Sequence, residues 1–169
     1  MSFKIITISR EFGSGGRFIG EQIAQKCGIE FYDKKIIEHV AKELGISEQI
    51  VANQGEYAPA GSIFSYAFVG RDITGVSLSD QIFNIQQKLI KDIAQKEPCV
   101  IVGRCADYAL SDNPNCLNVF IRSDMEDRIK RISKRLDITE NKAKDMCIKK
   151  DKQRSSYYNY YTNNSSFWQ

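Results

Sequence analysis

The stretch "REFGSGGRFIGEQIA" (residues 10–24) has the composition of a phosphate-binding loop. Its glycines follow an apolar run and precede an amphipathic run. Glycines at such a turn adopt positive φ angles and let an anion approach the backbone closely. Backbone N–H groups and the partial positive charge of a helix N-terminus can then bind phosphate with few side chains. The predicted phosphate cradle consists of Gly13, Ser14, Gly15, Gly16 and Arg17.

Arg17 stands where a phosphate loop usually has its lysine, and Phe18 stands at the usual hydroxyl residue. The guanidinium of Arg17 is a forked cation, so it can still bind phosphate oxygens and serve in catalysis. Two other interpretations of the glycines stay open. They can form a tight strand–helix turn with no ligand, or they can begin a dinucleotide fingerprint, with Asp33 placed to bind a ribose. Phe18, at the third glycine of that fingerprint, argues against the second.

Two further sites follow predicted strands. Asp33 ends the stretch "EFYD", and Arg104 and Asp107 lie in "VGRCADY" (102–108), directly after an apolar run. In an open α/β sheet, ligands bind beyond the carboxyl ends of the strands, so these three residues are candidates for one substrate crevice. The alternatives are an Arg104–Asp107 surface pair, and Asp33 as the N-cap of the helix that begins at Lys34.

A basic segment precedes the tyrosines of "SSYYNYY", late in the chain. Lys150, Lys152 and Arg154 belong to it, and residues 149–162 are a candidate lid that would bring cations onto a transferring phosphate. Lys152 and Arg154 are therefore candidate catalytic residues. A solvated charged helix face is the alternative. The tyrosines could stack on bases of single-stranded RNA, but packing against the domain is the commoner role, and no nucleic-acid partner is expected.

The elements that must position these residues alternate along the chain. Short apolar strands are expected at residues 3–9, 30–33, 99–103 and 117–121. Helical patterns separate or follow them; Ser79 or Asp80 caps the helix before Pro98, and Asp124 and Thr139 cap the last two. Residues 53–80 show no clear period and are expected to form an irregular insert. This alternation predicts an α/β fold with a parallel sheet covered by helices on both faces.

The bulk composition limits the protein class. A chain of 169 residues, 42% hydrophobic and 27% charged, is expected to form one domain over residues 1–169. The five cysteines are odd in number and lack a CxxC pair, which favours reduced thiols in the cytoplasm over disulfides or zinc. No charged-then-apolar leader opens the chain, and no apolar run approaches the ~20 residues of a membrane span, so no membrane association is expected.

Taken together, five motifs resemble the cytidylate kinase-like family, a nucleoside monophosphate kinase branch of the phosphate-loop kinases. They are "ITISREFGSGGRFIGEQIA", "FYDKKII", "VIVGRCADY", "VFIRSDMEDRIKRI" and "DKQRSSYYNYYT". The resemblance implies a three-layer phosphate-loop fold, ATP with Mg²⁺ as donor, and a nucleoside monophosphate, CMP or dCMP, as acceptor. It also implies that Asp33, Arg104 and Asp107 line the acceptor site.

The chain departs from this family where oxygens usually hold the metal. Glu11 replaces the first glycine of GxxxxGK[ST], Phe18 replaces the hydroxyl residue, and Val102 replaces a strand acid. Glu11 is the candidate metal-side residue, directly or through waters; pairing with Arg10 or Arg104 is the alternative. A nucleotide sensor without phosphoryl transfer is thus the second functional hypothesis. The family core also has a fifth strand and a final helix, so a further C-terminal segment is expected.

Overall fold

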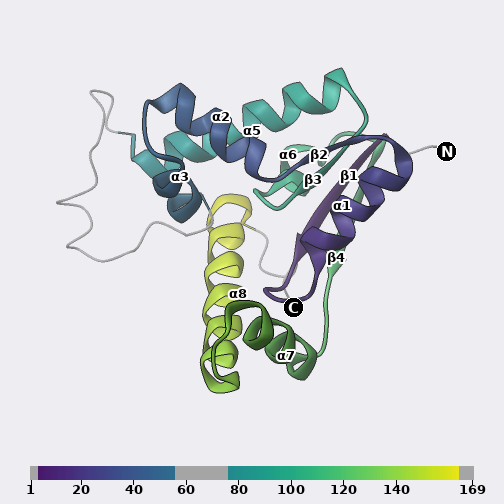
Figure 1. The fold of residues 1–169 in the computed structure, drawn as a ribbon. Coiled ribbons are helices and arrows are strands. Elements are labelled where there is room, and N and C mark those ends of the chain that lie inside the picture. Colours follow the sequence, from purple (N-terminus) through teal and green to yellow (C-terminus); the bar gives the residue numbers. More distant parts are fainter. Residues whose placement is uncertain (1–3, 56–75, 164–169) are drawn as a thin grey trace.

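The computed structural model describes residues 4–55 and 76–163, and its centre is a parallel four-stranded sheet (Figure 1). The strand order is β2-β3-β1-β4. The strands are β1 (Ile5–Arg10), β2 (Glu30–Tyr32), β3 (Cys99–Val102) and β4 (Cys116–Ile121). Because neighbours run parallel, with Ile8 opposite Val102 and Val119, the carboxyl ends of β1 and β3 lie side by side. The fold therefore gathers the segments after these strands at one edge.

Helix α1 (Gly16–Cys27) covers one face of the sheet. Its Ala24 packs with Ile8, Val100 and Val102, which are all buried. Gly20 is the point of closest approach, because a Cβ atom there would lie 2.9 Å from Cδ1 of Ile8. The helix ends at Gly28, whose φ of 64° is the left-handed conformation that suits a glycine cap. Close packing of α1 fixes the loop that precedes it.

The other face carries a larger core. It is covered by α2 (Lys34–Leu44), α3 (Glu48–Gln54), α5 (Leu78–Lys96) and the short α6 (Ala106–Ala109). Fully buried side chains from these helices pack on Ile5 and Ile101 of the strands; among them are Ile36, Val40, Val51, Ile82 and Ile90. Helices thus lie on both faces, which confirms the predicted three-layer α/β architecture.

Two helices project away from the sheet, as Figure 1 shows in green and yellow. They are α7 (Met125–Leu136) and α8 (Glu140–Thr162), and they pack through Ile132, Ala143 and Cys147. The far end of α8 returns to the main body, where Tyr157 and Tyr158 pack with Phe83 of α5. Residues 149–162, the predicted lid, are therefore helical and belong to α8.

Several local predictions need correction. Ser77, two or three residues before the predicted caps, begins α5 and accepts a hydrogen bond from the N–H of Asp80. Asp124 occupies the N-cap position of α7 without a side-chain cap bond. Helix α3 was not expected from the sequence, whereas α6 is the helix expected between the third and fourth strands. Of the predicted insert at 53–80, residues 56–75 lie outside the described part, while Asn53, Gln54 and residues 78–80 are helical.

Candidate nucleotide site

The glycine loop lies between β1 and α1 and has the backbone expected of an anion cradle. Gly13 and Gly15 have φ angles of 83° and 88°, which favour glycine, and α1 begins directly after Gly15. The buried Ser14 hydroxyl donates to the carbonyl of Glu11 over 3.0 Å and closes the turn. The N-terminal N–H groups of a 12-residue helix therefore open at this loop, as the sequence predicts.

Arg17 and Asp33 form an ion pair across the mouth of the loop. Nε of Arg17 lies 2.9 Å from Oδ2 of Asp33, with side-chain exposures of 54% and 14%. Asp33 is the N-cap residue of α2, as the sequence predicts, although its side chain makes no capping hydrogen bond. The pair brings the phosphate loop and the end of β2 together at one place.

Arg104 follows β3 in a strained segment. Gly103, Arg104 and Cys105 have φ angles of 75°, 61° and 52°. Consecutive non-glycine residues in the left-handed region are costly, and such strain clusters at functional sites. The Arg104 side chain is 6% exposed, and its Nε and Nη1 have no hydrogen-bond partner among the described residues. The segment thus holds a buried cation whose donors are available to a ligand.

Asp107 lies behind this segment. It is 6% exposed, and its Oδ2 accepts a hydrogen bond of 2.6 Å from the hydroxyl of Tyr158. Burial raises the pKa of Asp107 above its ordinary value, while the bond from Tyr158 lowers it in part. Both Arg104 and Asp107 are buried, so the interpretation as a surface pair is wrong.

A cavity of about 610 Å³ joins the loop to these strand ends. Asp33 and Arg104 line it together with the glycine loop, so the structure brings the predicted donor and acceptor residues to one cleft. Among the described residues, its basic lining consists of Arg10, Arg17, Lys34, Arg104, Arg131, Arg135 and Arg154. Asp107 and Lys152 do not line it. The lining is strongly cationic, as polyphosphate binding requires.

The projecting helices are tied to the phosphate loop. Asp151 of α8 accepts from the N–H of Phe12 over 2.6 Å and from Nη1 of Arg128 over 2.5 Å. Arg128 also donates to the carbonyl of Phe12, and Arg131 donates to the carbonyl of Gly13. Since Arg128 is 4% exposed, this is a buried charged network that fixes the loop against α7 and α8.

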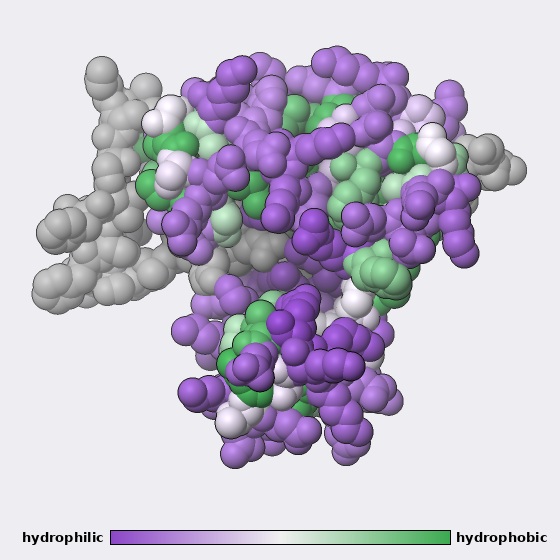
Figure 2. All heavy atoms as spheres, viewed as in Figure 1, coloured by the Kyte–Doolittle hydropathy of each residue, from purple (hydrophilic) through white to green (hydrophobic). Residues whose placement is uncertain are grey.

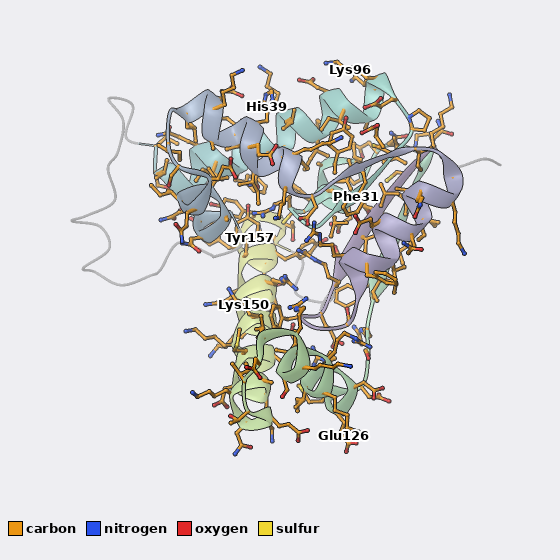
Figure 3. The ribbon with its side chains drawn as sticks, in the orientation of Figure 1. Phe31, His39, Lys96, Glu126, Lys150 and Tyr157 are labelled. Carbon is orange, nitrogen blue, oxygen red and sulfur yellow. The ribbon has the colours of Figure 1, made fainter. Side chains whose placement is uncertain are left out.

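The predicted lid residues of α8 have different environments. Arg154 lines the cleft, and its Nη1 donates to the carbonyl of Arg10 over 3.4 Å. Lys152 is exposed, and Lys150, labelled in Figure 3, lies on α8 away from its upper end. Tyr157, in the same figure, sits where α8 meets the main body, and its hydroxyl donates to Oε1 of Gln86. Tyr157 and Tyr158 are buried, which confirms packing against the domain for these two tyrosines, whereas Tyr160 is exposed.

Neither residue at the two metal-linked positions supplies a side-chain oxygen, and the carboxylate of Glu11 lies in the cleft. Phe18 is 67% exposed and has no oxygen, and Val102 is fully buried in the core under α1. Glu11 lines the cleft, and its Oε2 accepts from the N–H of Ser123 and lies 3.8 Å from Nη1 of Arg128. Its neighbour is thus Arg128, not Arg10 or Arg104. A magnesium ion fits here only if phosphate oxygens and waters complete its coordination.

Arg131 and Arg135 line the cleft, in agreement with the sequence pattern that groups them with the candidate lid as cations for a transferring phosphate. Arg10 also lines the cleft, but no ligand role was predicted for it. Arg131 lies three residues after Arg128, and Arg135 lies four residues after Arg131, which puts them on one side of α7. Arg10 had no signal beyond its place at the end of β1. The dinucleotide interpretation is wrong, because β3 lies between β1 and β2, whereas that fold places strand 2 beside strand 1.

Comparison with known proteins gives a family and a fold. The model of the cytidylate kinase-like family matches residues 5–167. A solved structure from Eubacterium ventriosum ATCC 27560, an uncharacterized protein, is 32% identical, with a TM-score of 0.70 over 95% of this chain and 78% of that one. Shikimate kinase from Bacteroides thetaiotaomicron is 17% identical, with a TM-score of 0.52 over 91% and 80% of the two chains, and shares the phosphate-loop fold. No curated protein sequence matches.

Proposed function

Because this chain belongs to the cytidylate kinase-like family, we propose that it transfers a phosphoryl group from ATP to a nucleoside monophosphate, CMP or dCMP. The observation that carries the proposal is Arg104, a buried guanidinium in a cleft that also holds a phosphate loop. Two of its nitrogens have no hydrogen-bond partner within residues 4–55 and 76–163. A buried charge without a counterion is strongly unfavourable. The cleft therefore has two places that suit an anion, which are the glycine loop and Arg104.

The donor phosphates would lie in the glycine loop. Gly13, Ser14, Gly15 and Gly16 would direct backbone N–H groups at the β- and γ-phosphates of ATP, and α1 would add its positive end. Arg17 would bind phosphate oxygens through its terminal nitrogens, because its Nε is occupied by Asp33. This is the role that a lysine has in the usual phosphate loop.

The acceptor would lie between the ends of β2 and β3. Arg104 would bind the monophosphate as a fork, and Asp33 would line the opposite wall. Asp107 would support the site from behind through its partner Tyr158, which lines a smaller cavity next to Arg104. The choice of a cytosine base rests on the family, so a panel of monophosphates must test it.

In the transfer step, a phosphate oxygen of the acceptor attacks the γ-phosphorus, and the bond to the β–γ bridging oxygen breaks to release ADP. Negative charge on the transferred group and the leaving oxygen would be stabilised by Arg17 and Arg154, which both line the cleft. Lys152 would contribute only on closure of residues 149–162 over the nucleotides, since its side chain is exposed. Mg²⁺ would neutralise the β- and γ-phosphates when bound, with Glu11 as the residue to hold it.

A nucleotide sensor is the second candidate function. Phe18 and Val102 carry no oxygen at positions where the family usually binds metal. Without these oxygens, the cleft can bind ATP and a monophosphate and yet transfer slowly, because metal positioning supplies much of the catalysis. Turnover separates the two candidates.

No membrane or nucleic-acid partner enters the proposal. Within residues 4–55 and 76–163, no helix has the length and apolar character that a bilayer crossing needs. The cysteines are all free thiols, which is compatible with the cytoplasm as the place of this reaction.

The test is to incubate the protein with ATP, Mg²⁺ and each of a panel of ribo- and deoxyribonucleoside monophosphates, and to separate the products by chromatography. We expect ADP and a nucleoside diphosphate in equal amounts, with CMP or dCMP preferred. Arg104→Met should weaken CMP binding about 10- to 100-fold, the loss of a charged hydrogen bond, and leave ATP binding within about twofold. Arg122→Met is the matched control, because Arg122 is exposed outside the cleft. ATP binding with no diphosphate formed would replace the kinase by the sensor.

A further inference from the structure

Arg10, the last residue of β1, packs against the first residue of α1. A Cβ atom on Gly16 would lie 2.7 Å from Cβ of Arg10 and 3.0 Å from its Cγ. These distances are too short for any side chain at residue 16, so Gly16 is required by the neighbouring arginine as well as by the loop. The alkyl part of Arg10 therefore lies directly beside Gly16 of the phosphate cradle.

The guanidinium of Arg10 reaches the end of β3. A Cβ atom on Gly103 would overlap Nη1 of Arg10 and would lie 3.0 Å from Cζ. Two glycines from separate strand ends thus make room for one side chain. The cation is placed between the phosphate loop and the strained segment that carries Arg104.

Arg10 lines two cavities. The cleft of about 610 Å³ and a smaller cavity behind it share three lining residues, which are Arg10, Arg104 and Arg154. The smaller cavity is also lined by Tyr157 and Tyr158. Figure 2 shows that the surface over α7 and α8 is largely hydrophilic. Arg10 therefore lines the space that a ligand would occupy if it extended from the loop toward Arg104.

The residue before Gly103 has an apolar side chain. Val102, directly before Gly103, is fully buried among Ile8, Ala24 and Val100, and so contributes no polar atom. A guanidinium lies beside this strand end, where the family usually has an acid. A guanidinium that packing holds in place repels a metal ion and attracts phosphate oxygens directly. No mobile ion has to lose its water shell for this interaction to form.

We propose that Arg10 binds the donor and acceptor phosphates at once, as a bridging cation between the glycine loop and Arg104. The proposal rests on the proposed kinase function and deepens it. It predicts that the protein binds a ligand with both phosphate groups in line more tightly than a ligand with either group alone. In this arrangement, Arg10 neutralises part of the negative charge of the two phosphate groups.

The probe is a bisubstrate analogue in which a polyphosphate chain joins adenosine to cytidine, with binding measured by calorimetry in EDTA and with Mg²⁺. We expect Arg10→Gln to weaken the analogue about 100-fold, and ATP or CMP alone about tenfold or less, because only the analogue presents both phosphate groups. Arg10→Lys keeps the charge but not the fork and should lose about tenfold. Arg122→Gln is the control, with thermal unfolding of each variant to verify the fold.

The outcomes separate this inference from the kinase function. Wild-type turnover with unchanged analogue affinity in Arg10→Gln and Arg10→Lys would overturn the role of Arg10 and leave the kinase intact. Equal losses for ATP alone and for the analogue would also overturn it, because Arg10 would then act on the donor only. If Arg10→Gln does not fold, Arg10→Lys alone decides. A wild type that binds the analogue but transfers nothing would end the kinase proposal, while the Arg10 variants would still test bridging.

Discussion

The carboxylate of Asp33, directly after β2, binds the guanidinium of Arg17 in the phosphate loop, with 2.9 Å between Oδ2 and Nε. This contact uses the inner nitrogen of the guanidinium and leaves the two terminal nitrogens to reach a phosphate. A lysine has a single nitrogen and cannot serve a carboxylate and a phosphate with the same geometry. The pair therefore explains why an arginine suits this loop.

Arg17→Ala should weaken ATP binding by about 1–3 kcal/mol without abolishing it, because backbone N–H groups carry the rest of the cradle. Arg17→Lys should recover only part of the loss, since Asp33 competes for the ammonium. Calorimetry with ATP measures both, and Lys26→Ala at the exposed far end of α1 is the control. Unchanged ATP affinity in Arg17→Ala would show that the Arg17 side chain does not bind ATP and would count against the loop as the donor site.

Asp151→Asn should loosen the attachment of the phosphate loop to α7 and α8. It leaves Arg128, whose side chain is 5% exposed, without its 2.5 Å counterion, and the breaking of such a pair costs about 3 kcal/mol. Urea unfolding measures the loss. Asp145→Asn, an exposed change on the same helix, should stay within about 0.5 kcal/mol. Equal stability of the two variants would show that the network does not hold the loop.

Gly20→Ala should destabilise the protein although alanine favours helices. The added methyl would lie 2.9 Å from Ile8, 3.2 Å from Phe31 and 3.3 Å from Val102. Overpacking of this kind costs about 1–3 kcal/mol, against about 1 kcal/mol gained in helix propensity. Thermal unfolding gives the net effect, with exposed Gln25→Ala as the control. A variant more stable than wild type would show that α1 can move away from the sheet.

Asp107 should make stability depend on pH. Its pKa in the folded protein is raised by burial above the ordinary 3.8, so protonation favours the folded state. The contribution of the carboxyl is largest below the ordinary pKa and is lost as pH rises through the raised pKa. Asp107→Asn, which keeps an oxygen for the Tyr158 hydroxyl, removes this dependence.

The measurement is urea unfolding from about pH 4 to about pH 7. Relative to wild type, the free energy of unfolding of Asp107→Asn should rise across this interval, while Asp112→Asn, on the exposed surface, follows wild type. A difference between Asp107→Asn and wild type that falls or stays flat would contradict a raised pKa at this position.

The strands and the glycine loop could be predicted because their signals are local. A buried parallel strand is a short apolar run, and three glycines before an amphipathic run mark a strand–helix turn. Asp33 and Arg104 could also be predicted, since the carboxyl ends of parallel strands share one edge. The resemblance to the cytidylate kinase-like family indicated phosphoryl transfer as the reaction class. The match over residues 5–167 confirms the family.

What could not be predicted depends on contacts between distant residues. Asp107 and Lys152 fit the site by sequence position, but one is buried against Tyr158 and the other is exposed on α8. Arg10 shows no motif of its own; only the approach of β1 to the end of β3 reveals where its guanidinium lies. Helix α3 was missed because its seven residues are too few for a clear period.

The bond from the Phe12 N–H to Asp151 joins residues 139 positions apart in the sequence. A ribosome that makes this chain from its N-terminus therefore produces the phosphate loop long before its anchor in α8. Contacts of such long range form late, since the intervening chain must be ordered before they close. The nascent protein would fold its sheet while still attached, and it would acquire nucleotide binding only after α8 had emerged and packed beside the loop.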